Sequence, residues 1–117
     1  MISSREIILL DERDRADYED FLENSDFKDI LQSWEWGEIK SGFGWKPQRL
    51  AMVNGLKKEG IVQVLEKRFF SGLSILYIPR GPVIDWIDPE AVSDFLRLIN
   101  GFVRKQRGTR PIFLRIE

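Results

Sequence analysis

Apolar runs separated by polar turns predict five short strands in this chain of 117 residues. The strands are expected at residues 6–10, 46–53, 61–69, 73–78 and 111–116. Alternate side chains of the third strand face opposite sides, so that Ile61 and Leu65 face one side while Val62 and Val64 face the other. The first strand is a continuous apolar run and is expected to be buried.

An Asn54-Gly55 pair predicts a tight hairpin turn after the second strand, because both residues tolerate positive φ angles. The polar residues 57–60 leave a longer loop open as the alternative. In either case the second, third and fourth strands predict an antiparallel meander. Prolines at 79 and 82 end the fourth strand, because proline cannot donate to a ladder.

Helical periodicity predicts a first helix over residues 14–24, with Asp14 as its N-cap. A third helix is expected to begin at Asp88-Pro89-Glu90 and to end at Gly108. The strand–helix–strand crossover around it favours parallel pairing of the last strand with an earlier one. The predicted order is β-α-α-β-β-β-α-β, an α+β (mixed α/β) fold with a mostly antiparallel twisted sheet and flanking helices.

The second helix is expected within the aromatic segment LQSWEWGEIKSGFGW, residues 31–45. Ser33 is a candidate cap for a helix that starts at Trp34, and Gly42 and Gly44 are expected to end it. Trp36, Ile39 and Phe43 then share one face, which is expected to anchor the helix to the sheet.

Length and composition predict a single domain over residues 1–117, with 43% hydrophobic residues and a net charge of −1. The edge of the last strand would lie open unless another element covered it. The chain is therefore expected to be the front part of something longer, or to pair with a second copy along that strand.

The chain contains no cysteine and no histidine. Disulfides are therefore excluded, a metal site would have to rely on carboxylates, and proton transfer would fall to Asp, Glu, Lys or Tyr. No apolar run approaches the roughly twenty residues that span a bilayer, and no signal-peptide pattern is present. A cytoplasmic protein, not integral to the membrane, is expected.

Basic residues gather near the end of the third helix, at Arg97, Arg104, Lys105, Arg107 and Arg110. They could face the phosphates of a tRNA, or they could simply stabilise the negative end of the helix dipole. No glycine-rich phosphate loop is found, since the glycines at 42 and 44 lack a third and stand at a helix end.

Four blocks resemble the first half of the Fem family in order and approximate spacing. They are LQSWEWGEIK (31–40), FGW (43–45), QVL (63–65) and YIPRGPVID (77–85). Fem proteins are the aminoacyl-tRNA-dependent peptidyltransferases that build the interpeptide bridge of bacterial peptidoglycan, including lipid II:glycine glycyltransferases. The resemblance implies a GNAT-like fold, of which this chain would be the first part of one unit.

The same resemblance implies the substrates and partners. The acceptor would be a peptidoglycan precursor, either UDP-muramyl pentapeptide or lipid II, and aminoacyl-tRNA would be the co-substrate, reached through the full-length enzyme. No further cofactor is implied. The location would be the cytoplasm or the inner face of the membrane, and a piece of this length is expected to be inactive alone.

Four residues match positions of interest in the family. Lys40 would contact precursor phosphate, or be a solvated lysine; Tyr77 would orient the acceptor peptide, or be a core tyrosine. Arg80 would clamp phosphate or carboxylate, or pair with Asp85 and hold its loop. Asp85 would be a polar contact or the base for the attacking amine, or only a local cap. Lys40, Tyr77 and Arg80 are expected to look into one hollow.

The leading hypothesis is therefore the precursor-binding, N-terminal part of a Fem-type aminoacyltransferase. A non-catalytic GNAT-like binding or assembly domain, docking a partner on the edge at residues 111–116, is the alternative. A fragment of a small-molecule acetyltransferase is a weaker third reading.

Overall fold

The computed structural model describes residues 4–106 and 110–117. Its strands are β1 (Arg5–Leu9), β2 (Lys46–Asn54), β3 (Lys57–Arg68), β4 (Leu73–Ile78) and β5 (Arg110–Ile116). Its helices are α1 (Arg15–Glu23), α2 (Trp34–Ser41) and α3 (Pro89–Arg104), with short 3-10 turns at Glu12–Asp14 and Ile30–Gln32. The predicted order of strands and α-helices is confirmed.

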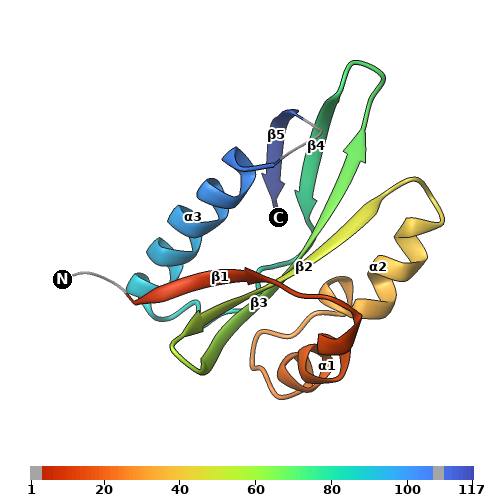
Figure 1. Cartoon of the computed structure of the whole chain (residues 1–117). Coiled ribbons are helices and arrows are strands. Elements are labelled where there is room, and N and C mark those ends of the chain that lie inside the picture. Colours follow the sequence, from red (N-terminus) through yellow and green to blue (C-terminus); the bar gives the residue numbers. More distant parts are fainter. Residues whose placement is uncertain (1–3, 107–109) are drawn as a thin grey trace.

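One sheet contains all five strands in the order β1-β2-β3-β4-β5, and it is visibly twisted (Figure 1). The first three pairings are antiparallel and the β4–β5 pairing is parallel, as the crossover through α3 predicts. Strands β1 and β5 are the two edges of this sheet.

Helix α3 covers one face of the sheet, while α1 and α2 lie on the other (Figure 1). The core under α3 is the larger one; it contains Leu50, Met52, Val62, Val64, Leu76, Ile78, Ile84, Ala91, Phe95 and Ile99. The core under α1 and α2 contains Tyr18, Trp34, Ala51, Ile61 and Val83. Side chains of β3 therefore contribute to both cores, as the predicted alternation requires: Val62 and Val64 to the first, and Ile61 to the second.

The expectation that the first strand is buried is wrong. Ile8 is 41% exposed and Leu9 is 65% exposed, because β1 is an edge strand with no neighbour on its outer side. Ile7 of β1 still packs against the core under α3 and is partly buried there.

The tight hairpin between β2 and β3 is confirmed, and the longer loop is not formed. Gly55 has φ +63 and stands with Leu56 between the paired residues Asn54 and Lys57. The polar segment therefore belongs to β3, which begins at Lys57 rather than at Ile61.

Ser33 caps α2 as predicted, since its hydroxyl accepts the backbone N–H of Trp36 at 3.1 Å. The predicted buried face is wrong, because Trp34 is 1% exposed whereas Ile39 and Phe43 are 48% and 70% exposed. The helix instead turns Trp34 and Gly37 toward the sheet. The side chains of Arg49 and Gln63 lie beneath the helix and leave no room for a Cβ at Gly37.

The other helix ends differ in detail. Asp14 precedes α1 as predicted but does not cap it; its carboxylate accepts the backbone N–H of Asp11 at 2.9 Å. Helix α3 ends at Arg104, earlier than predicted, whereas Gly108 and Arg107 lie outside the described residues. Each helix within the described ranges is too short or too polar to cross a bilayer.

Candidate functional site

Gln32 fills a gap in the hydrogen-bond ladder of the sheet. Strands β3 and β4 pair from Leu65 to Arg68 of β3. On the same side of β3, the next pairing joins Ile61 to Val83, which lies beyond the proline-rich loop. Between these points the Gln32 amide accepts the Gln63 N–H at 2.8 Å and donates to the Gln63 carbonyl at 3.3 Å. It also donates to the Pro79 carbonyl at 2.8 Å, which attaches the loop at 79–82 to β3.

Gln32 is fully buried, and the backbone of the loop passes close over its amide. A Cβ at Gly81 would lie 2.5 Å from the Gln32 Cδ, so glycine is required there while the amide keeps its place. The hydroxyl of Tyr18 donates to the Gln32 carbonyl at 2.6 Å, and burial raises the pKa of this tyrosine well above its usual value.

Gln63 and Arg49 continue this buried polar network beneath α2. The Gln63 amide donates to the Ser33 carbonyl and accepts from Arg49 Nε, both at 2.8 Å. Arg49 also donates to the Trp34 carbonyl at 2.8 Å, and its guanidinium lies 4.1 Å from the centroid of the Trp34 ring. Burial lowers the pKa of Arg49, while the Glu38 carboxylate at 3.3 Å opposes that shift.

This network explains the first block of the family resemblance. Gln32 fixes the loop, Ser33 caps α2, and a Cβ at Gly37 would overlap Gln63 Oε1. The network thus determines where α2, which carries Lys40, lies relative to the loop that carries Arg80.

The backbone of Arg80, in this loop, has a φ angle of +54°, a left-handed conformation that residues other than glycine adopt rarely. Its guanidinium contacts the Asp29 carboxylate at 3.3 Å, and the side chain remains 62% exposed. The alternative in which Arg80 pairs with Asp85 is wrong, because Asp29, ahead of the turn Ile30–Gln32, takes that place.

Lys40 and Tyr77 meet at the ring of Trp45. Lys40 Nζ lies 5.8 Å from the Trp45 ring centroid, and the centroids of the Trp45 and Tyr77 rings are 6.3 Å apart. The Tyr77 hydroxyl donates to Glu117 Oε1 at 2.7 Å. This hydrogen bond raises the pKa of Tyr77 and lowers that of Glu117.

The expectation that Lys40, Tyr77 and Arg80 look into one hollow is wrong, because Tyr77 and Arg80 line two different hollows and Lys40 lines neither of them. Arg80 and Glu117 line one of about 330 Å³, whereas Trp45, Tyr77 and Arg115 line one of about 280 Å³. Contacts through Trp45 lead from Lys40 to Tyr77, and Tyr77 binds Glu117, which lines the same hollow as Arg80.

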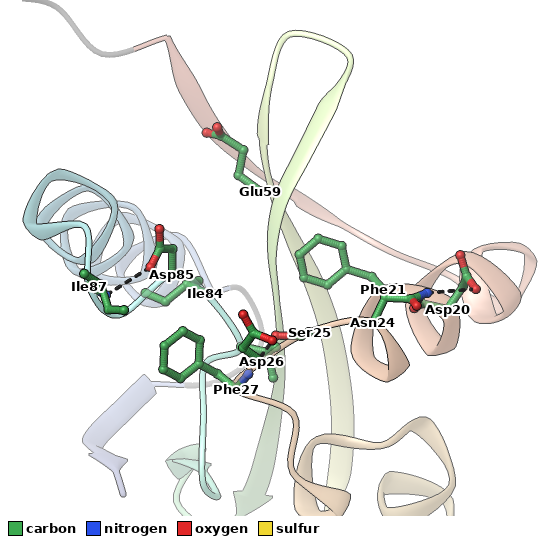
Figure 2. A pocket seen from close by; sticks show the side chains of 11 residues that line it. Asp20, Phe21, Asn24, Ser25, Asp26, Phe27, Glu59, Ile84, Asp85 and Ile87 are labelled. Atoms are coloured by element: carbon green, nitrogen blue, oxygen red, sulfur yellow. Dashed lines mark hydrogen bonds between the residues drawn. The ribbon is translucent and has the colours of Figure 1, made fainter.

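Asp85 lies in a separate cavity of about 670 Å³, between α1, the loop that follows it and the segment before α3 (Figure 2). Its carboxylate accepts the backbone N–H of Ile87 at 3.1 Å, which is the geometry of a local cap. Asp20 and Asp26 also line this cavity, together with aromatic side chains. Within the described ranges, no three potential metal ligands converge closely enough to hold an ion.

The two basic residues of α3 have positions that do not require a nucleic acid. Arg97 contacts Asp94 at 3.6 Å, and Arg104 stands in the last helical turn, where the dipole favours a cation.

The arrangement of the sheet, with an antiparallel meander followed by a helix and a parallel fifth strand, is that of a GNAT-like acyltransferase fold. The chain is similar in structure to the aminoglycoside acetyltransferase meta-AAC0020 from an uncultured soil metagenomic sample, which was crystallised with trehalose. The TM-score is 0.57 at 14% sequence identity, over 97% of this chain and 77% of that one. This likeness shows the fold, and it confirms the predicted fold class.

The sequence model of the FemAB family matches residues 14–117, so the chain belongs to the FemAB family, a family of transferases. It is also similar to the crystal structure of FemX, with a TM-score of 0.70 and 26% identity over 83% of this chain. The matched part covers 24% of FemX, so the chain spans about a quarter of that relative. No curated protein matches it closely enough to count as a relative.

Sequence reasoning did not identify three residues of this surface: Lys67, Arg115 and Glu117. Lys67 Nζ lies 5.3 Å from the Trp45 ring centroid, and the Arg115 guanidinium lies 5.8 Å from that of Tyr77. A correct β4–β5 register would have pointed to Arg115, since it pairs with Tyr77.

Proposed function

We propose that this chain is the precursor-binding, N-terminal part of an aminoacyl-tRNA-dependent transferase that extends the stem peptide of a peptidoglycan precursor. Membership of the FemAB family supports the reaction class. The observation that carries the proposal is the surface on which Lys40 and Tyr77 flank Trp45 and Arg80 adjoins Glu117.

The charges of this surface suit a phosphorylated ligand. Lys40 makes no ion pair within the described part of the chain, and its flexible ammonium can follow a phosphate. Arg80 is largely exposed and has only Asp29 as an ion-pair partner there, so its donors can also reach a phosphate or carboxylate.

In the proposed reaction, an amine of the stem peptide attacks the ester carbonyl of aminoacyl-tRNA. A new amide bond forms, the ester bond breaks, and the tRNA hydroxyl leaves. This part of the enzyme would contribute by holding the precursor, so that catalysis rests on positioning. We leave Asp85 out of this site, because it caps a loop in a separate cavity. The precursors place the reaction in the cytoplasm or at the inner face of the membrane.

Tryptophan fluorescence during titration with UDP-muramyl pentapeptide tests the proposal, since Trp36 and Trp45 both lie within 6 Å of Lys40 Nζ. Saturable binding is expected, and Lys40→Ala should weaken it about tenfold or more, the effect of one contact to a charged group. Lys57→Ala, at the far hairpin turn, is the matched control and should bind normally. No response at millimolar precursor, or equal binding by both variants, would refute the proposal.

The assembly-domain alternative keeps one observation in its favour, namely that β5 is an edge of the sheet. It predicts a concentration-dependent dimer or a captured strand, measurable by light scattering, without any response to the precursor.

A further inference from the structure

The turn between β3 and β4, residues 69–72, which we term the aromatic tip, carries two exposed phenylalanines. Phe70 is fully exposed and Phe69 is 47% exposed. The turn itself is well defined, since the Phe69 N–H donates to the Leu73 carbonyl at 2.8 Å and the Gly72 N–H donates to the Phe69 carbonyl at 3.2 Å. Figure 1 shows this turn at the top of the view, projecting beyond the helices and the other strands.

The fold gives no reason for phenylalanine at this turn. Tight turns favour Gly, Asn, Asp, Ser and Pro, and the positive φ angle of this one, +78°, falls on Gly72. A fully exposed ring at position 70 adds nothing to either core. The apolar surface of the aromatic tip is therefore available to something outside the chain.

Cations flank the aromatic tip on both faces of the sheet. Lys67 and Arg68 precede it as consecutive residues of a strand, so their side chains project from opposite faces. Arg110 begins β5 beside the turn, where its N–H donates to the Gly72 carbonyl at 2.7 Å. Lys46, the first residue of β2, lines a cavity together with Arg68. Within the described residues, Lys46, Lys67 and Arg110 make no ion pair.

Acidic side chains are scarce around these cations. The sequence has no Asp or Glu between residues 67 and 84 or between residues 95 and 116. Glu66 is the acid that precedes the tip; its side chain is fully buried and pairs with Arg68 Nε at 3.0 Å. The other cations beside the tip are therefore not neutralised by it.

A bilayer that contains anionic lipids suits this combination. Phenyl rings on a projecting turn can enter the boundary between headgroups and acyl chains, while lysine and arginine reach the lipid phosphates. A second copy of the chain suits it less, since two side chains bury far less than the roughly 1,200 Å² of a stable protein interface. A nucleic acid would use the cations but not the rings, because bases stack along a groove and not on a convex turn.

We infer that the aromatic tip inserts into the surface of an anionic bilayer, with Phe69 and Phe70 below the headgroups and the neighbouring cations against the lipid phosphates. This inference goes beyond the proposed function and does not rest on it, since neither a precursor nor a tRNA takes part. Trp45 then lies close to the bilayer surface, because Lys67 Nζ is 5.3 Å from its ring centroid.

Sedimentation with lipid vesicles tests this inference. The chain should bind vesicles made of equal parts of phosphatidylglycerol and phosphatidylcholine, should bind phosphatidylcholine alone weakly, and should be released by high salt. Phe70→Ser should weaken binding to the mixed vesicles about tenfold, and Arg110→Gln about fivefold. Phe70→Ser opens no core, because the side chain is fully exposed, so its melting temperature should equal that of the parent.

The hairpin between β2 and β3 offers matched controls. Leu56 stands at its turn and is also fully exposed, and Lys57 follows as the first residue of β3. Leu56→Ser and Lys57→Gln therefore remove the same kinds of group at a different turn, and both variants should bind the mixed vesicles like the parent.

Fluorescence gives a second measurement. In Phe70→Trp an indole stands at the apex, and brominated lipids should quench this variant more strongly than the parent. No binding to the mixed vesicles, or equal losses for Phe70→Ser and Leu56→Ser, would overturn the inference. A dimer that Phe70→Ser dissociates would overturn it too, as would a preference for tRNA over vesicles that Arg110→Gln loses and Phe70→Ser keeps.

Discussion

Replacing Gln32 by Leu tests whether one buried amide holds the sheet and the Arg80 loop together. Leucine has a similar volume but no polar group. The substitution therefore leaves the Gln63 N–H and two carbonyls, those of Gln63 and Pro79, without the partners that they now have.

The expected loss can be worked out from these three bonds. A buried N–H left unpaired costs about 1–3 kcal/mol, and an under-satisfied carbonyl costs less because it is tolerated more often. Leucine gains some apolar burial in return, so the net destabilisation should be about 3 kcal/mol. For a domain of this size that corresponds to a melting temperature lower by roughly 12 °C.

Thermal unfolding followed by circular dichroism measures this loss, and hydrogen exchange locates it. Exchange at the Gln63 amide should accelerate strongly, while that at Leu50, on the neighbouring strand, should rise only with global stability. Gln106→Leu is the matched control, because within residues 4–106 and 110–117 its side chain makes one long hydrogen bond, of 3.4 Å, with Gln48. A melting temperature for Gln32→Leu within 2 °C of the parent would refute the structural role given to this amide.

Further outcomes follow from the same network. Gly37→Ala should destabilise the chain by at least 2 kcal/mol in urea unfolding, because the new Cβ would overlap Gln63 Oε1 and approach Arg49 Nη2 to 2.5 Å. Gly101→Ala, in α3 with open space around it, should instead stabilise by about 0.5–1 kcal/mol; the same sign for both glycines would contradict the close packing. The raised pKa of Tyr18 means that its stabilisation is complete below pH 10 and declines as the pH rises from there toward the folded-state pKa. Alkaline unfolding curves should show this decline, Tyr18→Phe should be less sensitive in the same range, and identical curves would argue against burial of the hydroxyl.

The order of elements could be predicted because each signal is local. The N-cap Asp88 followed by Pro89, and the Gly55 turn, act within a few residues, and the structure keeps both. The parallel pairing of β5 followed from crossover geometry. The exposed outer positions of β1 were missed, because an apolar run does not tell an edge strand from a central one.

The buried face of α2 could not be predicted from periodicity. A hydrophobic stripe is expected to face an apolar surface, yet here the helix packs over Arg49 and Gln63. That polar floor exists because both side chains satisfy carbonyls of the segment that precedes and begins the helix, namely Ser33 and Trp34. These contacts join positions far apart in the sequence, so a periodicity measured over a short segment cannot reveal them.

The candidate site was predicted in part, and through family resemblance rather than through physics. Lys40, Tyr77 and Arg80 came from matched blocks, and the structure connects them through Trp45 and Glu117. Asp85 does not lie with these three residues, because after Pro82 the chain changes direction and Asp85 lines a different cavity. Its spacing in the sequence could not reveal that turn.

The attachment of the loop at 79–82 also bears on how a ligand arrives. Because a buried amide holds this loop to β3, we expect the Arg80 segment to stay in place rather than to swing aside as a hinged lid would. An incoming molecule therefore meets a surface whose shape is already set, and little of its binding free energy is lost to ordering the protein. Association should accordingly be a single fast step, with no slow closing phase after the first encounter.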